Sequence, residues 1–276
     1  NKIPSLGWDV SPILKTPVRE RRKNATRRSA SCGLNEGRMT RYTFNKNWRA
    51  VRTALSGRNR VICLDLPNHG RSPQVPHVDL RSMGEDVCET LDAMGVESAV
   101  VIGHSLGGKV AMQLASDHAV RLRGLVVVDI SPRPIQPIQL FVLRACQQLD
   151  LASATRRSEL DAALAQSIPQ AETRDFLLKN VVRDDAGKFV WRVPLQWLID
   201  NYRVVSDAPP LAAPYAGPTL FVAGEASPFM ITRDEALIRG WFPAARFVTV
   251  PKAGHLVHID QPERFLDTVR CSIPGA

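Results

Sequence analysis

The stretch from Val100 to Met112 decides how the rest of the chain is interpreted; it reads Val-Val-Ile-Gly-His-Ser-Leu-Gly-Gly-Lys-Val-Ala-Met. β-Branched apolar residues lead into it and helix-forming residues follow it. Ser105 lies between Gly103 and Gly107 in the pattern Gly-x-Ser-x-Gly. The pattern predicts a sharp strand-to-helix turn that pushes the Ser105 hydroxyl out of the sheet, because the glycines remove Cβ atoms that would clash there. The backbone N–H of Leu106 then points at any group bound beside the helix.

Apolar strands and amphipathic helices alternate on both sides of this turn. Short apolar runs bounded by Gly, Pro or Asp predict buried strands at residues 60–65, 99–102, 125–129, 219–223 and 246–250. Helical spacing of apolar residues predicts helices at residues 48–55, 80–94, 106–117, 233–241 and 262–270. This alternation predicts an α/β fold, with a mostly parallel sheet covered by helices on both faces.

Two regions depart from the alternation. Residues 134–210 contain several helix-like segments with no buried strand between them, which predicts a helical cap inserted into the α/β core. Residues 1–41 show no sustained periodicity and predict a disordered tail. The predicted organisation is therefore a tail at 1–41, a first core part at 42–133, the cap at 134–210 and a second core part at 211–276.

The net charge of +9 belongs mainly to the tail. Residues 1–41 hold ten basic and three acidic side chains, whereas the remaining residues hold 26 and 24. The core therefore has no nucleic-acid signal, and no apolar run approaches the ~20 residues that a membrane span needs. Five cysteines without Cys-x-x-Cys spacing favour reduced thiols and a cytoplasmic protein. An Arg-rich, Ser-rich tail is also typical of a transit segment, so a mitochondrial or plastid location is the alternative.

His255 is the predicted base for Ser105. A serine hydroxyl is a weak nucleophile at neutral pH and needs a base within hydrogen-bond reach. His255 follows the predicted strand at 246–250, and Gly254 allows the connecting loop to bend sharply. Because functional groups of open α/β sheets gather at the carboxyl ends of strands, Ser105 and His255 are expected at the same edge. His104 precedes the serine and is interpreted as structural.

The residue that orients this histidine has two candidates. Asp129 ends the strand after the serine's helix, and neighbouring strand ends lie only ~4.8 Å apart. Glu225 lies in the loop after the strand at 219–223, where an aspartate is expected and Ser227 stands instead. Asp129 is the preferred acid, with Ser227 as a supporting hydrogen-bond partner and Glu225 as the alternative. Such an arrangement needs neither a metal nor an organic cofactor.

The cap is expected to contribute the substrate-binding surface. Its large aromatic side chains are the candidate lining residues, although packing in the core is an equally good interpretation of each: Phe141, Trp191, Trp197 and Tyr202.

Four motifs together resemble the α/β-hydrolase superfamily: Asp-Leu-Pro-Asn-His-Gly-Arg-Ser at 65–72, Gly-His-Ser-Leu-Gly-Gly-Lys at 103–109, Val-Val-Asp-Ile-Ser-Pro at 127–132 and Ala-Gly-His at 253–255. More narrowly, they resemble the YbfF-type esterase and acyl-CoA thioesterase branch, which includes the mitochondrial alpha/beta hydrolase domain-containing proteins. The resemblance covers residues 42–276. It implies a serine nucleophile, a histidine base, an acid after the next strand and a serine in the later loop; Ser105, His255, Asp129 and Ser227 match these places.

The resemblance implies a serine hydrolase that cleaves small-molecule carboxylic esters or acyl thioesters through an acyl-enzyme. One departure concerns the second oxyanion donor, because the family's strand ending in His-Gly has no counterpart before Trp48 and the first strands look missing or replaced. The alternative is therefore an impaired or non-catalytic hydrolase-like binding protein. A phosphate-binding loop at Gly103-x-x-x-x-Gly108-Lys109 is a further alternative, but Val110 stands where that motif needs Ser or Thr. The oligomeric state is not predicted.

Overall fold

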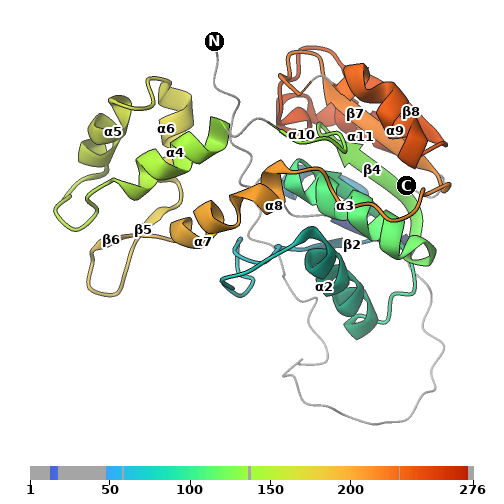
Figure 1. The fold of residues 1–276 in the computed structure, drawn as a ribbon, viewed down its shortest axis with the longest axis horizontal. Helices are drawn as coiled ribbons and strands as arrows, with labels where there is room; N and C mark the ends of the chain where they lie inside the picture. The colour runs from blue at the N-terminus through green and yellow to red at the C-terminus, as the bar shows by residue number, and fades with distance from the viewer. Residues whose placement is uncertain (1–12, 18–47, 58, 136–137, 230, 273–276) are drawn as a thin grey trace, which may run out of the picture.

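A six-stranded sheet forms the centre of the protein in the computed structural model, which describes residues 13–17, 48–57, 59–135, 138–229 and 231–272. The strand order is β2-β1-β3-β4-β7-β8, and the four strands from β3 to β8 run parallel. The predicted α/β fold is therefore confirmed (Figure 1). The strands of this sheet are β1 (Ile13–Pro17), β2 (Asn59–Cys63), β3 (Ala99–His104), β4 (Leu122–Val128), β7 (Thr219–Gly224) and β8 (Ala245–Val250).

Strand β1 corrects the prediction that residues 1–41 form a disordered tail. Ile13–Pro17 pairs antiparallel with both β2 and β3 and fills the place between them. The physical reason is that β2 and β3 each present an edge of backbone groups that another strand can satisfy, whatever its side-chain periodicity. The remainder of the predicted tail lies outside the described residues.

Helices cover both faces of the sheet, as the strand residues themselves dictate. Alternate side chains of β3 and β4, such as Val101 and Val127, enter a cluster with helices α2 and α3. Their neighbours Val100 and Val126 enter a second cluster with α1 and α11. Both sets are buried, which explains why the strands are continuously apolar. The helices of this part are α1 (Arg49–Leu55), α2 (Leu80–Ala93), α3 (Leu106–Asp117), η1 (Ala119–Arg121), η2 (Ile231–Asp234), α9 (Glu235–Trp241), α10 (Val257–Asp260) and α11 (Pro262–Ser272).

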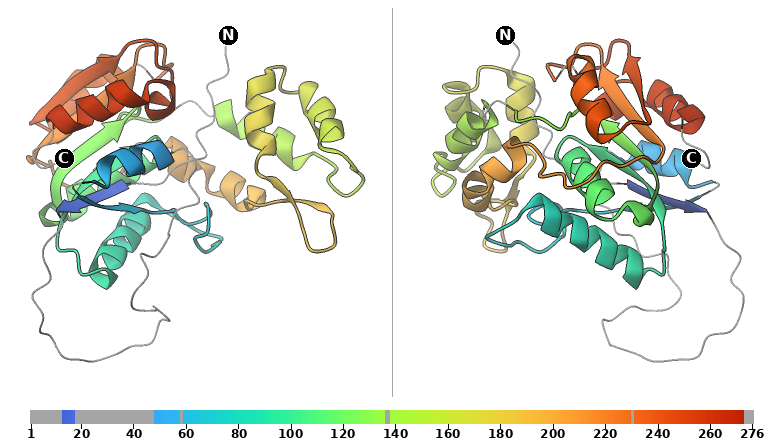
Figure 2. Two further views of the ribbon diagram at one scale, coloured as in Figure 1. Left: turned by 180° about the vertical axis from the view of Figure 1, so that it is seen from behind. Right: turned by 45° about the vertical axis from the view of Figure 1, so that its right-hand side comes forward.

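Between β4 and β7 the chain leaves the sheet and forms what we call the inserted segment, residues 138–206. It has a hydrophobic cluster of its own, built from residues such as Leu160 and Phe189. Figures 1 and 2 show it as a separate lobe beside the sheet, joined to it near α8. Its elements are α4 (Ile138–Gln147), α5 (Arg157–Ala165), α6 (Ala171–Leu178), β5 (Val181–Arg183), β6 (Phe189–Trp191), α7 (Leu195–Asp200) and α8 (Tyr202–Ser206).

The β5–β6 hairpin corrects the expectation of helices alone in this segment. Val181 pairs with Trp191 and Arg183 with Phe189. The turn between them is set by the Asp184 side chain, which accepts hydrogen bonds from the backbone N–H groups of Ala186 and Lys188.

No helix among the described residues is both long and apolar enough to span a lipid bilayer.

Candidate active site

The carboxyl ends of four neighbouring parallel strands carry the predicted site residues. Ser105 follows β3, Asp129 follows β4, Ser227 lies in the loop after β7 and His255 in the loop after β8. Since the order in the sheet is β3-β4-β7-β8, these ends lie side by side at one edge. The fold thus places residues 150 positions apart in one small region.

Ser105 occupies the strained turn that the sequence predicts. Its φ of 52° and ψ of −120° lie in a region that residues with a side chain rarely adopt. The Ser105 N–H donates to the carbonyl of Val128 at 3.1 Å, which ties the turn to the end of β4. Gly103 is required for this turn, because a Cβ atom there would lie 2.2 Å from the carbonyl oxygen of Gly107. Leu106 is the first residue of α3, where the helix offers its N–H no carbonyl partner.

Asp129 is a buried carboxylate that accepts three hydrogen bonds. One oxygen accepts from the backbone N–H of Gly224 at 3.0 Å, and the other accepts from the Ser227 hydroxyl and from His255 Nδ1, the latter at 2.7 Å. Ser227 Oγ in turn accepts the N–H of Phe229 at 3.2 Å. Asp129 also has a positive φ of 54°, so two strained residues adjoin at this edge. Both oxygens of this buried side chain therefore have hydrogen-bond donors.

The contact with Asp129 fixes the hydrogen position on His255. A carboxylate can only accept, so Nδ1 of His255 carries a hydrogen, and in the neutral ring the lone pair is then on Nε2. The backbone of His255 is held as well, because His104 Nε2 donates to its carbonyl oxygen at 2.8 Å. The residue before the serine therefore ties the loop that carries the histidine to the end of β3.

Phe229 is a site residue that the sequence did not identify. Its ring centroid lies 4.4 Å from that of His255, and the His104 ring lies 4.5 Å from the same imidazole. Phe229 is half-buried and lies two positions after Ser227. The only available signal was its nearness in sequence to Ser227.

His258 and Trp48 lie behind this site. Their rings stack at 4.0 Å with an angle of 5° between the planes, and the His258 ring lies 5.2 Å from that of His104. Neither nitrogen of the buried His258 has a hydrogen-bond partner among the described residues. Burial, with a smaller contribution from nearby His255, lowers the pKa of His258 to about 3. His258 is therefore neutral at physiological pH.

The other predicted residues have contacts with other parts of the molecule or are exposed. Glu225 is exposed, and its carboxylate accepts the backbone N–H of Lys252 in the next loop. Phe141 on α4 is 57% exposed, whereas Tyr202 on α8 is buried in the cluster of the inserted segment. Trp191 on β6 packs against the same cluster, and Trp197 on α7 is half-buried.

Among the described residues, no group of three or more His, Cys, Asp or Glu side chains is placed to hold a metal ion.

Comparison with known proteins agrees with this arrangement. The model of the alpha/beta hydrolase family matches residues 37–268. The mouse sn-1-specific diacylglycerol lipase ABHD11 is 36% identical over 237 residues, which cover 83% of this chain and 76% of the lipase. Esterase YbfF of Escherichia coli (strain K12) is 32% identical over 77% of this chain and 82% of the esterase. A solved structure described as a marine microorganism esterase superposes with a TM-score of 0.76 at 30% identity, covering 82% of this chain and 89% of the esterase.

The parallel sheet and the serine turn at its carboxyl edge define the class of an α/β hydrolase. The chain belongs to the alpha/beta hydrolase family, as the match over most of its length shows. The relatives named above are esterases and a lipase, which supports ester hydrolysis as the general activity.

Proposed function

We propose that the protein is a serine hydrolase that cleaves carboxylic esters through an acyl-enzyme formed on Ser105. The observation that carries the proposal is the buried pair of Asp129 and His255, 2.7 Å apart, beside the strained turn of Ser105. This pair gives an imidazole with Nε2 available as a base at the edge where the serine lies.

The acylation step follows from these roles. Ser105 Oγ attacks the acyl carbonyl carbon while its proton passes to His255 Nε2, and the carbonyl π electrons move to the oxygen. The Leu106 N–H donates to that oxyanion. The tetrahedral intermediate then collapses, the bond to the leaving group breaks, and the leaving oxygen takes the proton from His255. Asp129 stabilises the imidazolium in between and keeps the ring in one tautomer.

Deacylation repeats these steps with water as the nucleophile. His255 Nε2 takes a proton from the water as its oxygen attacks the acyl-enzyme. It returns that proton to Ser105 Oγ as the acid leaves. Every proton removed is returned, so the reaction needs no cofactor.

The substrate is proposed to be an ester of a small or medium acyl group. A lipase and esterases among the relatives support an oxygen ester, and thioesters remain a second substrate class for the same steps. We further propose that the inserted segment is a cap, with Phe141, Trp191, Trp197 and Tyr202 as candidates for contacting the acyl group. The phosphate-binding and non-catalytic alternatives predict no reactive serine.

Replacement of the serine tests the proposal. Ser105→Ala is expected to abolish hydrolysis of p-nitrophenyl butyrate and labelling by a fluorophosphonate probe, with a melting temperature close to that of the wild type. Ser56→Ala, an exposed serine at the end of α1, is the control and should label normally. Turnover retained by Ser105→Ala would contradict the assignment. A folded wild type that neither labels nor hydrolyses would favour the binding-protein alternative.

A further inference from the structure

Helix α3, which begins directly after Ser105, carries a stripe of polar side chains on one face. Its first ten residues, Leu106–Ala115, are all buried, yet they include Lys109 and Gln113. Ser116 continues the series, and spacings of four and three residues place the three side chains on one side of a helix. Buried polar groups need partners, so the stripe must face hydrogen-bonding groups.

The partner of the stripe is the backbone of what we call the return segment, residues 206–213, where the chain leaves the inserted segment. Lys109 Nζ donates to the carbonyl oxygens of Ser206 at 3.1 Å and Asp207 at 2.6 Å. One turn later Gln113 Nε2 donates to Pro210 O at 3.3 Å. Ser116 Oγ donates to Ala213 O at 3.0 Å and accepts the N–H groups of Ala212 and Ala213.

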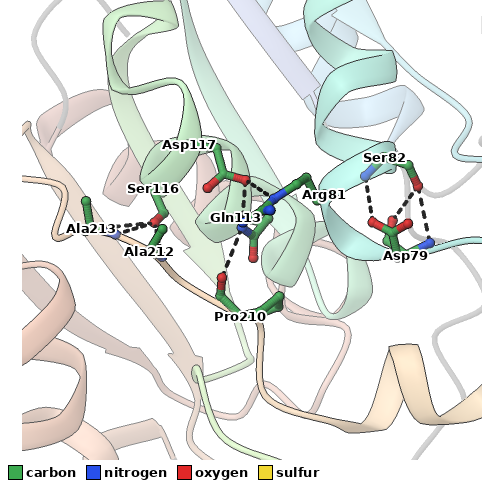
Figure 3. Close-up of polar contacts among 9 residues, drawn as sticks. All are labelled: Asp79, Arg81, Ser82, Gln113, Ser116, Asp117, Pro210, Ala212 and Ala213. Atoms are coloured by element: carbon green, nitrogen blue, oxygen red, sulfur yellow. Dashed lines mark hydrogen bonds and ion pairs between the residues drawn. The ribbon is translucent and has the colours of Figure 1, made fainter.

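Figure 3 shows the far half of this contact, with Gln113 and Ser116 directed at the return segment. Asp117 accepts from Gln113 at 2.7 Å and from Arg81 of α2 at 3.1 Å, so the helix is also tied to its neighbour. The return segment forms no regular helix or strand beyond Ser206, and side chains of α3 supply several of the hydrogen bonds that its backbone makes.

The Lys109 side chain binds where the chain entering the inserted segment, at Ile135, meets the chain leaving it, at Ser206. The carbonyl of Ser206 accepts from Lys109 and also from the N–H of Ile135, at 2.8 Å, which lies in the connection leading into the inserted segment. At the other end of the residue, the Lys109 N–H donates to Ser105 O at 3.1 Å. One residue thus contacts the nucleophile's own backbone and the junction of both connections.

A buried ammonium suits this junction better than a neutral side chain. Its charge strengthens the bonds to two carbonyl oxygens, which offsets part of the cost of removing it from water. Burial lowers the pKa of Lys109 to about 8, and the nearby Asp207 carboxylate opposes that shift. Methionine at this position would fill similar space but would bind neither carbonyl.

We propose that Lys109 is a positioning residue that fixes the inserted segment relative to Ser105 and so determines which acyl groups reach the serine. This inference rests on the proposed function, because it assigns the acyl selectivity of that same site. The contacts of Lys109 are with backbone atoms at the junction, so its loss allows the whole inserted segment to shift while the hydrogen bonds of Asp129 and His255 stay intact.

Lys109→Met tests the proposal by its effect on the ratio of kcat/KM for p-nitrophenyl decanoate to that for p-nitrophenyl acetate. We expect this ratio to change by about tenfold, mainly through KM for the decanoate, with kcat for the acetate within about threefold of wild type. Ser116→Ala is the matched control, since it removes bonds to the far end of the same return segment. It should lower the melting temperature and leave the ratio unchanged.

An unchanged ratio in Lys109→Met, or an equal change in both variants, would overturn the proposal and leave Lys109 a residue of stability alone. Should Lys109→Met fail to fold, Lys109→Gln, which keeps an amide donor, is measured in the same way. Failure of both to fold also counts against a role in selectivity. A wild type that hydrolyses neither ester and is not labelled at Ser105 contradicts the proposed function instead, so the two failures are distinguishable.

Discussion

Asp129 in the candidate site and His258 behind it are both buried, but their surroundings differ completely. Asp129 accepts hydrogen bonds from Gly224, Ser227 and His255. His258 packs against Trp48 and Phe265 and has no hydrogen bond to either nitrogen among the described residues. A buried group keeps a charge only where donors or an opposite charge compensate the lost water. The surroundings of Asp129, which we call the acid side of the site, can therefore stabilise a charge. The surroundings of His258 behind the site cannot.

This difference determines which imidazole can take up a proton. His255 and His258 belong to one group of rings with His104, and a second positive charge there would repel the imidazolium of His255. His258 avoids this because its pKa is about 3. His104 donates through Nε2 to the carbonyl of His255, so it contributes to this group as a hydrogen-bond donor. The comparison predicts that changes on the acid side affect catalysis, whereas changes at His258 affect stability.

Among the changes that test this comparison, Asp129→Asn is expected to have the largest effect. The amide presents an N–H toward Nδ1, which favours the wrong tautomer of His255 and removes the charge that stabilises its cation. We expect kcat for p-nitrophenyl butyrate to fall by on the order of 10³–10⁴. Glu225→Gln is the comparison, since Glu225 bonds Lys252 and should cost little. A greater loss in Glu225→Gln than in Asp129→Asn would show that the acid has been assigned to the wrong residue.

A smaller loss is expected for Ser227→Ala. It removes one of three donors to Asp129 and leaves the His255 contact in place, so we expect kcat to fall by about 10- to 100-fold. Ser131→Ala is the matched control, because Ser131 donates to the buried carboxylate of Asp234 at 2.5 Å in the same way. Both variants should lose similar stability in urea unfolding, and only the first should lose activity. Equal activity in the two would make Ser227 a residue of stability.

The positions of three candidate site residues could be predicted from the sequence. Ser105 and Asp129 directly follow strands whose continuous apolar runs are visible in the sequence, and His255 follows such a strand by a short loop. The parallel sheet then brings their ends together. Local pattern and sheet topology were sufficient to predict that these three residues lie at one edge of the sheet, and the predicted fold class is confirmed.

What the sequence could not show depends on contacts between distant segments. The bond from His104 to the carbonyl of His255 spans 151 positions, and no local pattern encodes it. Strand β1 was missed because it is only five residues long and pairs with strands that are distant from it in the sequence. The hairpin in the inserted segment was missed because strands of three residues show too little alternation to be recognised.

The smallest effect, and the one confined to acid pH, is expected for His258→Phe. The pKa of His258 is about 3 in the folded protein, against 6.5 for an ordinary histidine. Between these two pH values the unfolded chain therefore binds a proton at His258 and the folded protein does not. The free energy of unfolding is therefore unaffected by this proton uptake well above pH 6.5. It falls as the pH drops from 6.5 toward 3, and the loss is about 2 kcal/mol at pH 5. Phenylalanine keeps the stacking on Trp48 without this penalty.

Urea unfolding at pH 8 and pH 5 tests this prediction. The free energy of unfolding should fall less between these pH values in His258→Phe than in wild type, with kcat at pH 8 nearly unchanged. His77→Phe, at an exposed position, should show the same acid loss as wild type. If His258→Phe shows that loss too, a buried neutral His258 is not what limits acid stability.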